Sequence, residues 1–382
     1  MKRNVVIIIL CLLILIPTVG YLYLRHHVLK AKDYKPDNSK AKNVLDLRPS
    51  VIAKLQQLVK DGSNGLYRLS MDSIEPNVLT SQVTVFNASI NIDSAAMKQL
   101  DGEKRLPDDI FKIKFNTLHI DGLGLDAFLH QKNIDLTDIL INKPVIDLYH
   151  QQRSYNEAKR EADASKTLYQ RLMGNMNRIA IGKVDIKDGI FIEHFPSKEP
   201  PLKFHDLSVN LKDILIDSST QFDNKRVFFA KHAALITRNY TFVTTDNLYA
   251  IKAGTISVSG ENNSLIAENI HIKPNHDREG LARIMKYRKE VYTLDLPHLA
   301  LEGINWRSLL TGEKLIAEKA DIQNADIGVF FDMSLPINKS LTLKYPQQKL
   351  MALNFPLAVS KVQFKNARIS RTEYNPKIKN TF

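Results

Sequence analysis

The fold is decided by residues 111–150, FKIKFNTLHIDGLGLDAFLHQKNIDLTDILINKPVIDLYH, and by residues 292–331, YTLDLPHLALEGINWRSLLTGEKLIAEKADIQNADIGVFF. The two stretches align without a gap at a spacing of 181 residues. Most of their apolar positions match in kind, and Gly122 meets Gly303. Similarity at a fixed spacing indicates a repeated structural unit. We therefore predict that the chain is internally duplicated.

The segments that flank these two stretches also repeat. They are 66–69 with 248–251 at a spacing of 182, Ile90 and Ile92 with Ile270 and Ile272 at 180, and 180–187 with 358–365 at 178. Chance matching of strand patterns would not keep four segments in one order at nearly one spacing.

Alternation of apolar and polar residues predicts β-strands through most of the chain. Phe111, Ile113 and Phe115 alternate with lysines, which is typical of a strand with one dry and one wet face. The alternation slips by one residue between Phe115 and Leu118, which indicates a bulge or a short turn. We predict a mainly β fold with a few helices, in which an elongated, curved, duplicated antiparallel sheet forms a trough.

The composition divides the chain into four parts. They are an N-terminus and transmembrane signal anchor at 1–24, a basic linker and short helix at 25–62, a first β unit at 63–220 with a polar helix at about 152–175, and a second, incomplete β unit at 221–382. A helix is expected at 50–61 and another near 278–289, the latter with Leu281, Ile284 and Met285 facing inward. Each of Gly122 and Gly303 follows an acidic residue, and we expect both to form equivalent turns between a strand and a short helix.

The N-terminal segment is long enough to cross a membrane. Residues 5–24 read VVIIILCLLILIPTVGYLYL and carry no charge. Twenty helical residues at about 1.5 Å each span about 30 Å, the thickness of a bilayer core. Because this run is longer than the core of a cleaved signal peptide, we expect an uncleaved anchor. Both flanks are basic, and the positive-inside rule alone would leave the bulk of the chain in the cytosol.

The other motifs argue against most classes of chemistry. The formal charge is +12, but no basic face interleaved with aromatic residues indicates nucleic-acid binding. Cys11 is the only cysteine, so an intramolecular disulfide or a thiolate metal cluster cannot form. The eleven histidines lack metal-binding spacing, and the chain has no phosphate-binding loop or nucleophile elbow. We therefore expect no enzyme activity, no cofactor, no metal and no nucleic-acid partner.

The amphipathic strands have few amphipathic helices to cover their dry face. Either a second sheet seals this face, as in a sandwich, or the face stays an open apolar trough that another molecule covers. On physical grounds alone the sealed sandwich is the commoner outcome. The residues that would line the trough, or equally form an ordinary core, are Phe111, Ile113, Phe115, Leu118, Ile120, Leu294, Leu296, Leu299 and Leu301.

The chain resembles the AsmA-like family of Gram-negative bacteria, and in particular the long versions found in Bacteroidetes. The resemblance rests on the N-terminal anchor and on degenerate patterns at 118–122, 139–146, 249–259 and 299–310. The segment 139–146 is similar to the family's I-x-x-P-x-I strand. Longer members of the family continue past the point that corresponds to Phe382, so the resemblance does not extend to a bridge that reaches the outer membrane.

This resemblance implies a function and a location. Family members are anchored in the inner membrane with their bulk in the periplasm, an orientation opposite to that favoured by charge alone. They are similar to eukaryotic bridge-like lipid transfer proteins, whose β-trough carries acyl chains, and are linked to outer-membrane assembly and lipid homeostasis. The expected partners are therefore membrane phospholipids and other envelope proteins. The alternative is a structural envelope scaffold with a sealed β-sandwich core and no lipid.

Overall fold

The protein is described here from a computed structural model. It describes residues 48–77, 81–122, 133–157, 178–194, 201–220, 223, 226–227, 229–244, 247–310, 314–337, 357–378 and 380–381. The expected anchor at 1–24 and most of the expected polar helix at 152–175 lie outside these residues. Within the described ranges, no helix combines the length and the apolar character needed to cross a membrane.

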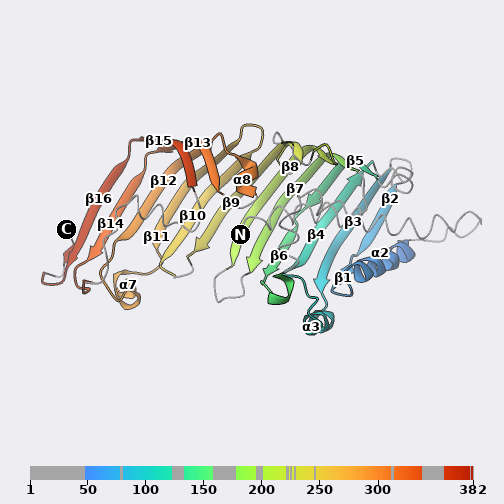
Figure 1. Cartoon of the computed structure of the whole chain (residues 1–382), viewed down its shortest axis with the longest axis horizontal. Coiled ribbons are helices and arrows are strands. Elements are labelled where there is room, and N and C mark those ends of the chain that lie inside the picture. Colours follow the sequence, from blue (N-terminus) through green and yellow to red (C-terminus); the bar gives the residue numbers. More distant parts are fainter. Residues whose placement is uncertain are drawn as a thin grey trace, which may run out of the picture. The chain divides into compact units, whose positions relative to one another are not determined.

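The described part of the chain is mainly β, with 64% of its residues in strands and 12% in helices (Figure 1). The strands are β1 (Tyr67–Ser70), β2 (Ser73–Asn77), β3 (Gln82–Ile92), β4 (Asp109–Asp121), β5 (Asn133–Asn142), β6 (Val145–His150), β7 (Arg178–His194), β8 (Leu202–Ile216), β9 (Ala230–Val243), β10 (Tyr249–Ser259), β11 (Ser264–Pro274), β12 (Val291–Glu302), β13 (Leu315–Gln323), β14 (Asp326–Asp332), β15 (Leu357–Lys365), β16 (Arg368–Asn375) and β17 (Asn380–Thr381). The helices are α2 (Arg48–Gly62), α3 (Ser94–Gly102), α7 (Arg278–Ile284), α8 (Trp306–Leu310) and the 3-10 turn η2 (Ser154–Asn156).

The chain forms two compact units. We call Asn4–Pro196 with Leu207–Ala233 the N-terminal unit, and Ser197–Asp206 with Ala234–Phe382 the C-terminal unit.

In the N-terminal unit, strand β4 lies between β3 on one side and β5 and β6 on the other. All three pairings are antiparallel. Strands β5 and β6 follow one another along β4, interrupted by Lys143 and Pro144. Strand β7 then runs parallel to both β5 and β6. A parallel neighbour requires a crossover connection of about a dozen residues or more, and residues 151–177 form this connection.

The C-terminal unit repeats this pairing scheme. Strand β12 pairs antiparallel with β11, β13 and β14. Strands β15 and β16 run parallel to β13 and β14, after a connection formed by residues 333–356. Each unit is therefore a mixed sheet, and the prediction of an antiparallel sheet is wrong at these pairs. The two long connections are the feature of the sequence that allows parallel neighbours.

The registers of the two units correspond residue by residue. Leu118 pairs with Ile141 in the N-terminal unit, as Leu299 pairs with Ile322 in the C-terminal unit. The same hydrogen bond also recurs, since the Phe111 amide donates to the Tyr67 hydroxyl and the Tyr292 amide to the Tyr249 hydroxyl, each at 3.2 Å.

Strands β3 and β11 are the exception to the expected spacing. Ile90 pairs with Ile113, and its counterpart by register is Ile272, which pairs with Leu294. The spacing here is therefore 182 residues and not the predicted 180. Alternating apolar residues look alike when a strand is shifted by two positions, which explains the error.

A row of bulges crosses each sheet at equivalent positions. In the N-terminal unit Asn87, Lys143 and Asp188 have φ of 47°, 50° and 53°. Their counterparts in the C-terminal unit have φ of 52°, 55° and 53° and are Asn269, Asn324 and Asn366. The register places Asn116 of β4 directly opposite Asn87, so the predicted slip in alternation between Phe115 and Leu118 lies in this row.

The helices cover strand ends and edges. Helix α2 occupies the position predicted at 50–61, and Figure 1 shows it beside β1 and β2. Helix α7 also forms where a helix was expected and buries Leu281, with Met285 buried just after its end, but Ile284 is exposed. The inward orientation predicted for Ile284 is therefore wrong, because the helix ends at this residue and only its Leu281 side packs on the core. Helix α3 was not predicted, although the Asp93 carboxylate caps it by accepting hydrogen bonds from the amides of Ala95 and Ala96.

Candidate functional site

The predicted lining residues lie on the two equivalent central strands, β4 and β12. In the N-terminal unit Phe111 is half-buried and the other four are buried, namely Ile113, Phe115, Leu118 and Ile120. In the C-terminal unit Leu296 is buried and the other three are half-buried, namely Leu294, Leu299 and Leu301. Three positions of the repeat are therefore sealed in the N-terminal unit and partly open in the C-terminal unit, whereas Phe115 and its counterpart Leu296 are both buried.

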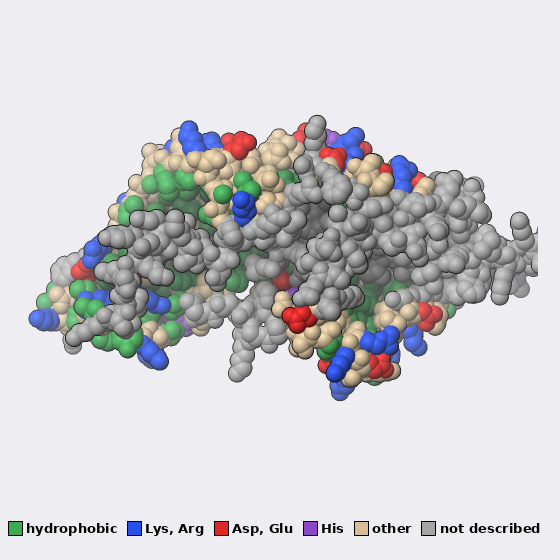
Figure 2. Space-filling view, viewed as in Figure 1, with side chains coloured by type: hydrophobic (Ala, Val, Ile, Leu, Met, Phe, Trp, Pro, Cys, Tyr) green, Lys and Arg blue, Asp and Glu red, His purple; other side chains and the backbone are tan. Residues whose placement is uncertain are grey.

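Neighbouring strands extend this half-buried apolar surface in the C-terminal unit. A small buried cluster holds Ala253, Ala267, Ile270, Leu296 and Ala325. Half-buried side chains pack around it, namely Tyr240, Ile256, Leu265, Ile272, Leu294, Leu299 and Ile322. We call these seven side chains the apolar face. Figure 2 shows hydrophobic side chains gathered between more polar borders in the region where Figure 1 labels β12 and β14.

Alanines explain why this surface stays open. The buried positions at the centre of the cluster carry Ala253, Ala267 and Ala325, which reach only a short distance above the sheet. At matching positions the N-terminal unit carries larger side chains. Val85 pairs with Leu118 where Ala267 pairs with Leu299, and Ile139 pairs with Ile120 where Ala320 pairs with Leu301. Small residues among large ones produce a shallow, uneven apolar surface.

The opposite side of the C-terminal sheet is polar and ionic. Lys365 donates to Asp321 at 2.9 Å, and Lys319 lies 3.3 Å from Glu302. The hydrogen bond from Lys365 holds the pKa of Asp321 below its ordinary value, and the hydrogen bond to Glu302 raises the pKa of Lys319. These pairs join β12, β13 and β15 on the side opposite the apolar face.

The two predicted turn glycines occupy equivalent positions. Gly122 directly follows β4 with φ of 77°, and Gly303 directly follows β12 with φ of 65°. A Cβ atom at Gly122 would meet Thr137, and one at Gly303 would meet Glu318, which is 181 residues further along. Helix α8 begins soon after Gly303 as predicted, whereas the short helix expected after Gly122 falls outside the described residues.

A cavity in the N-terminal unit was not predicted from the sequence. Its volume is about 450 Å³. Apolar and polar side chains line it together, from the end of β3, helix α3, the start of β4, the segment after β6, and Tyr149, His150 and His194 at the strand ends. Tyr149 and His194 stack with their ring centroids 4.4 Å apart. Burial, reinforced by the Asp147 carboxylate, raises the pKa of the Tyr149 hydroxyl. The lining comes from segments far apart in the chain, which is why no local pattern indicated it.

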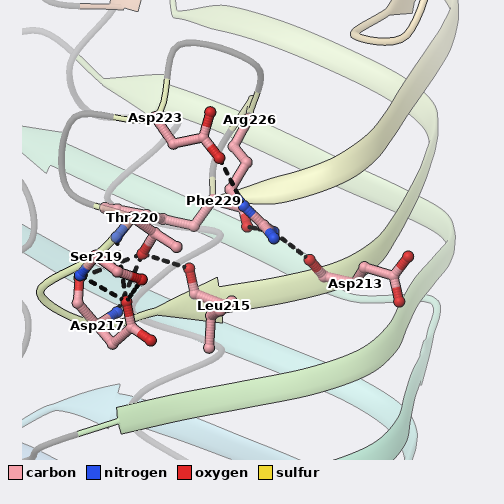
Figure 3. Close-up of polar contacts among 8 residues, drawn as sticks. All are labelled: Asp213, Leu215, Asp217, Ser219, Thr220, Asp223, Arg226 and Phe229. Carbon is pink, nitrogen blue, oxygen red and sulfur yellow. Dashed lines mark hydrogen bonds and ion pairs between the residues drawn. The ribbon is translucent and has the colours of Figure 1, made fainter.

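A cluster of polar contacts lies at the end of β8 and in the segment that leads to β9 (Figure 3). Arg226 donates to the backbone oxygens of Asp213 at 2.6 Å and Phe229 at 3.0 Å. Asp217 accepts hydrogen bonds from the amides of Ser219 and Thr220 at 2.8 Å and 3.1 Å.

These contacts serve the turn itself. Burial would raise the pKa of Asp217, but the hydrogen bonds from Ser219 and Thr220 outweigh it and hold the pKa below its ordinary value of 3.8. The Thr220 hydroxyl in turn donates to the Leu215 oxygen at 2.9 Å. The cluster therefore consists of turn contacts that fix the loop conformation.

No metal-binding arrangement was found in the part of the chain that the structure describes. Its histidine, cysteine and acidic residues form no group of three or more that could hold an ion. Four histidines pair instead with single aspartates on the same or a neighbouring strand, for example His150 with Asp109 at 2.6 Å.

Comparison with known proteins does not supply a function. No protein-family model matches the chain, and no curated protein matches it in sequence. The apolar face is therefore interpreted from its own geometry.

Proposed function

We propose that the chain is a membrane-anchored β-trough that binds or conducts lipid acyl chains. In this proposal residues 1–24 anchor it in the bacterial inner membrane and the bulk lies in the periplasm, where it acts in envelope assembly or lipid homeostasis. The mechanism is passive and needs no catalytic group or cofactor. Apolar side chains give acyl chains a dry surface, and each buried CH₂ contributes about 0.8 kcal/mol.

The observation that carries this proposal is the apolar face of the C-terminal unit. Seven large, half-buried side chains surround a buried centre of mostly small ones on one side of the sheet. Contiguous apolar surface of this kind mostly marks a site that another molecule covers. A flexible acyl chain suits a shallow, uneven surface because it adapts its shape and requires no polar partner.

A different observation favours the scaffold alternative. In the N-terminal unit the equivalent positions are already buried, with Ile113 only 2% exposed. A chain that fills this layer throughout would be a sealed structural protein. The lipid function therefore requires an open apolar face in the C-terminal unit, whereas the scaffold function requires that this face be sealed.

Photocrosslinking of the full chain in its native membrane tests for lipid at the apolar face. A photoreactive phenylalanine analogue placed at Leu299 is expected to capture phospholipid, detected by mass spectrometry of the protein. Glu268 is the matched control, since it is exposed on β11 and its neighbour Ala267 is the residue that pairs with Leu299. Equal capture at both positions, or none at Leu299, contradicts the proposal.

A charge substitution separates the two functions. Because Leu299 is half-buried, the carboxylate of Leu299→Asp stays hydrated if the trough is open. We then expect the chain to fold. We also expect a photoreactive residue at Leu294, on the same apolar face, to capture no lipid in this variant. In a sealed core the same carboxylate would be buried without a partner. It would then lower the free energy of unfolding by about 3 kcal/mol or more and unfold the unit. Ile113→Asp is the destabilising reference, because that site is sealed in either case. Circular dichroism melting curves of the two variants make the comparison.

A further inference from the structure

The cavity of about 450 Å³ in the N-terminal unit lies where helix α3 meets the ends of β4 and β6. Figure 1 shows α3 at this end of the sheet. Ile110 and Tyr149 line the cavity and are paired in the register, and the next pair along is Phe111 with Leu148. Successive side chains of a strand point to opposite faces of a sheet. Ile110 and Tyr149 therefore lie on the side opposite to Phe111, and this wall of the cavity is not part of the predicted trough lining.

The C-terminal unit has an equivalent place, which its own side chains fill. Helix α7 precedes β12 as α3 precedes β4, and Phe330 pairs with Val291 as Tyr149 pairs with Ile110. Phe330 and Leu335 are half-buried and pack there against a buried cluster that consists of Leu248, Leu281, Met285 and Val291. Tyr149, in contrast, is exposed and lines the cavity.

The position of the Tyr149 ring follows from its neighbour His194. The two rings stack with their centroids 4.4 Å apart and an interplanar angle of 6°. The His194 Nε2 atom lies 2.8 Å from the Asp147 carboxylate, which fixes the imidazole. The C-terminal unit carries Thr372 and Gly328 at the matching positions, so neither the histidine nor the aspartate recurs there. The N-terminal unit therefore holds an aromatic wall beside a hollow where the C-terminal unit packs a ring into its cluster.

In the C-terminal unit the chain itself supplies Leu335. The segment that carries this residue is held by Arg288. The Arg288 amide donates to the Pro336 oxygen at 2.9 Å, and the guanidinium donates to the Met333 oxygen at 2.9 Å. The filled place is thus part of the fold of this unit and not a site for another molecule.

In the N-terminal unit polar side chains close the same junction. Arg153 donates to the Pro107 oxygen at 2.7 Å. The Asn156 amide group donates to the Leu106 oxygen at 2.8 Å. A polypeptide that entered the cavity would have to displace these side chains to pair with the two backbone oxygens. A molecule that fills the space through apolar contacts does not compete for them.

The lining of the cavity combines an apolar floor with a polar rim. The floor consists of Ile92, Met97, Leu106 and Ile110. Leu106 and Ile110 are buried. Small-molecule sites typically occupy about 300 to 1,000 Å³ and combine an apolar lining with a few polar groups. The volume of this cavity lies near the lower end of that range, which suits one acyl chain better than the two chains of a phospholipid.

Lys98 of α3 supplies a cation at the rim. Its side chain is exposed and forms no ion pair with any residue that the structure describes. The lining holds one carboxylate, that of Asp101. Asp101 accepts a hydrogen bond from the Tyr155 hydroxyl at 2.5 Å and lies 3.5 Å from Arg153. An anionic group at the rim therefore meets an available lysine and a carboxylate that is already paired.

We propose that this cavity binds a single-chain amphiphile with an anionic head group, either a fatty acid or a lysophospholipid. The acyl chain lies on Met97, Leu106 and Ile110, and the head group stays in solvent at the rim and faces Lys98. This site goes beyond the proposed trough, because it lies in the other unit and selects one chain with a charged head. The apolar face, in contrast, is defined by apolar side chains alone.

Photolabelling of the full chain in phosphatidylcholine nanodiscs tests the proposal. The probe is palmitic acid with a diazirine at the end of its chain, and mass spectrometry identifies the labelled residues. We expect labels on the segments 92–110 and 149–153, which contribute most of the lining. Unlabelled palmitate and lysophosphatidylglycerol are the competitors that distinguish the two sources of the ligand. Hexadecanol tests the need for a charge, and dipalmitoylphosphatidylglycerol tests the preference for one chain.

A variant that fills the cavity locates the site. Met97→Trp places a larger side chain on the floor, and we expect it to weaken palmitate binding at least about tenfold. Met97→Leu is the matched control, because it nearly keeps the volume of the side chain and should leave binding unchanged. Circular dichroism melting curves show whether both variants fold.

A variant of the rim tests the head group. Lys98→Gln removes a charge at an exposed position, so the chain still folds. An exposed ion pair is a weak interaction, and we expect palmitate to bind about twofold to fivefold more weakly while hexadecanol binds as before. Lys60→Gln is the matched control, since Lys60 is exposed on helix α2 and does not line the cavity. This comparison holds whether or not Met97→Trp folds.

Three results would overturn the proposal. The first is labelling that a folded Met97→Trp variant leaves unchanged. The second is equal competition by hexadecanol and palmitate, which would remove the role of the charge. The third is equal competition by dipalmitoylphosphatidylglycerol, which would assign the cavity to the phospholipid surface. Lipid capture at Leu299 is measured separately, so this proposal and the proposed function fail independently.

Discussion

Single residues in the left-handed backbone region determine where each sheet bends and turns. Gly122 and Gly303 end the central strands with positive φ, and each stands where a Cβ atom would collide with the next strand. At Gly122 the collision involves the Thr137 backbone nitrogen at 2.8 Å as well as its hydroxyl oxygen. At Gly303 the three nearest atoms belong to the Glu318 side chain, with its Cβ at 2.7 Å. The two turns are equivalent in conformation, and at each of them a Cβ atom would meet an atom that is fixed to the next strand.

These clashes predict a cost for alanine at both positions. Gly122→Ala should lower the free energy of unfolding by more than about 1 kcal/mol, through positive φ and the clash with fixed backbone. Gly303→Ala should also cost more than about 1 kcal/mol, because φ is positive there and the Glu318 Cβ, 2.7 Å away, is fixed to the backbone. Urea denaturation measures both, with Gly102→Ala as the control, since a Cβ there meets nothing within 4 Å. Equal costs at Gly122 and Gly102 would contradict the prediction.

The sequence predicted positions more reliably than exposure at this scale. The pairs Gly122 with Gly303 and Leu118 with Leu299 followed from spacing alone, because a repeated backbone keeps its special residues. Whether Leu299 would be half-buried while Leu118 is buried could not be predicted. That depends on side chains of neighbouring strands, such as Ala267 beside Leu299 and Val85 beside Leu118.

At the scale of elements, the bulge row controls which side of each strand is apolar. The C-terminal unit places asparagine at all three bulges, Asn269, Asn324 and Asn366, and asparagine tolerates the left-handed region better than most residues. The N-terminal unit has asparagine at only one of the three, and Lys143 is the least suited of the others. The sequence indicated a bulge in β4 but not that the bulges form a row, because rows become visible only when strands are aligned side by side.

The second unit therefore suggests a stabilising substitution in the first. Lys143→Asn copies the residue found at the equivalent bulge and should raise the free energy of unfolding by about 0.5 to 1 kcal/mol. Conversely, a β-branched residue is poorly suited to positive φ, so Asn324→Val should be destabilising. Lys112→Asn, in the regular part of β4, is the control and should not stabilise the protein. A destabilised Lys143→Asn variant in thermal or urea denaturation would refute the argument.

At the scale of the whole molecule, the predicted β fold agrees with the structure in outline, but the topology differs. Period-two alternation is a local signal, so it indicates strands without indicating their partners. The parallel placement of β7, β15 and β16 depends on the long connections that precede them, residues 151–177 and 333–356. These connections were interpreted from composition as a polar helix in one case and were not interpreted in the other.

The proposed orientation of the chain can be measured directly. If residues 1–24 are an uncleaved anchor with the bulk in the periplasm, a C-terminal alkaline phosphatase fusion should be active and a C-terminal GFP fusion dark. The reason for the measurement is that the basic residues after the anchor favour the opposite orientation. A bright GFP fusion with inactive phosphatase would place the bulk in the cytosol and remove the basis of the periplasmic function.

The shared register of the two units has a consequence for how the chain folds. Strand β13 pairs with its neighbour β12. Strand β4, the counterpart of β12 in the other unit, presents a similar series of apolar and polar positions to its own partner β5. Pairs of strands from different units therefore compete with the native pairs during refolding, as in other proteins built from similar repeats. Differences between the repeats, such as alanine in one where the other has isoleucine, favour the native pairs by packing. Divergence between the two sequences thus protects the chain from kinetic traps.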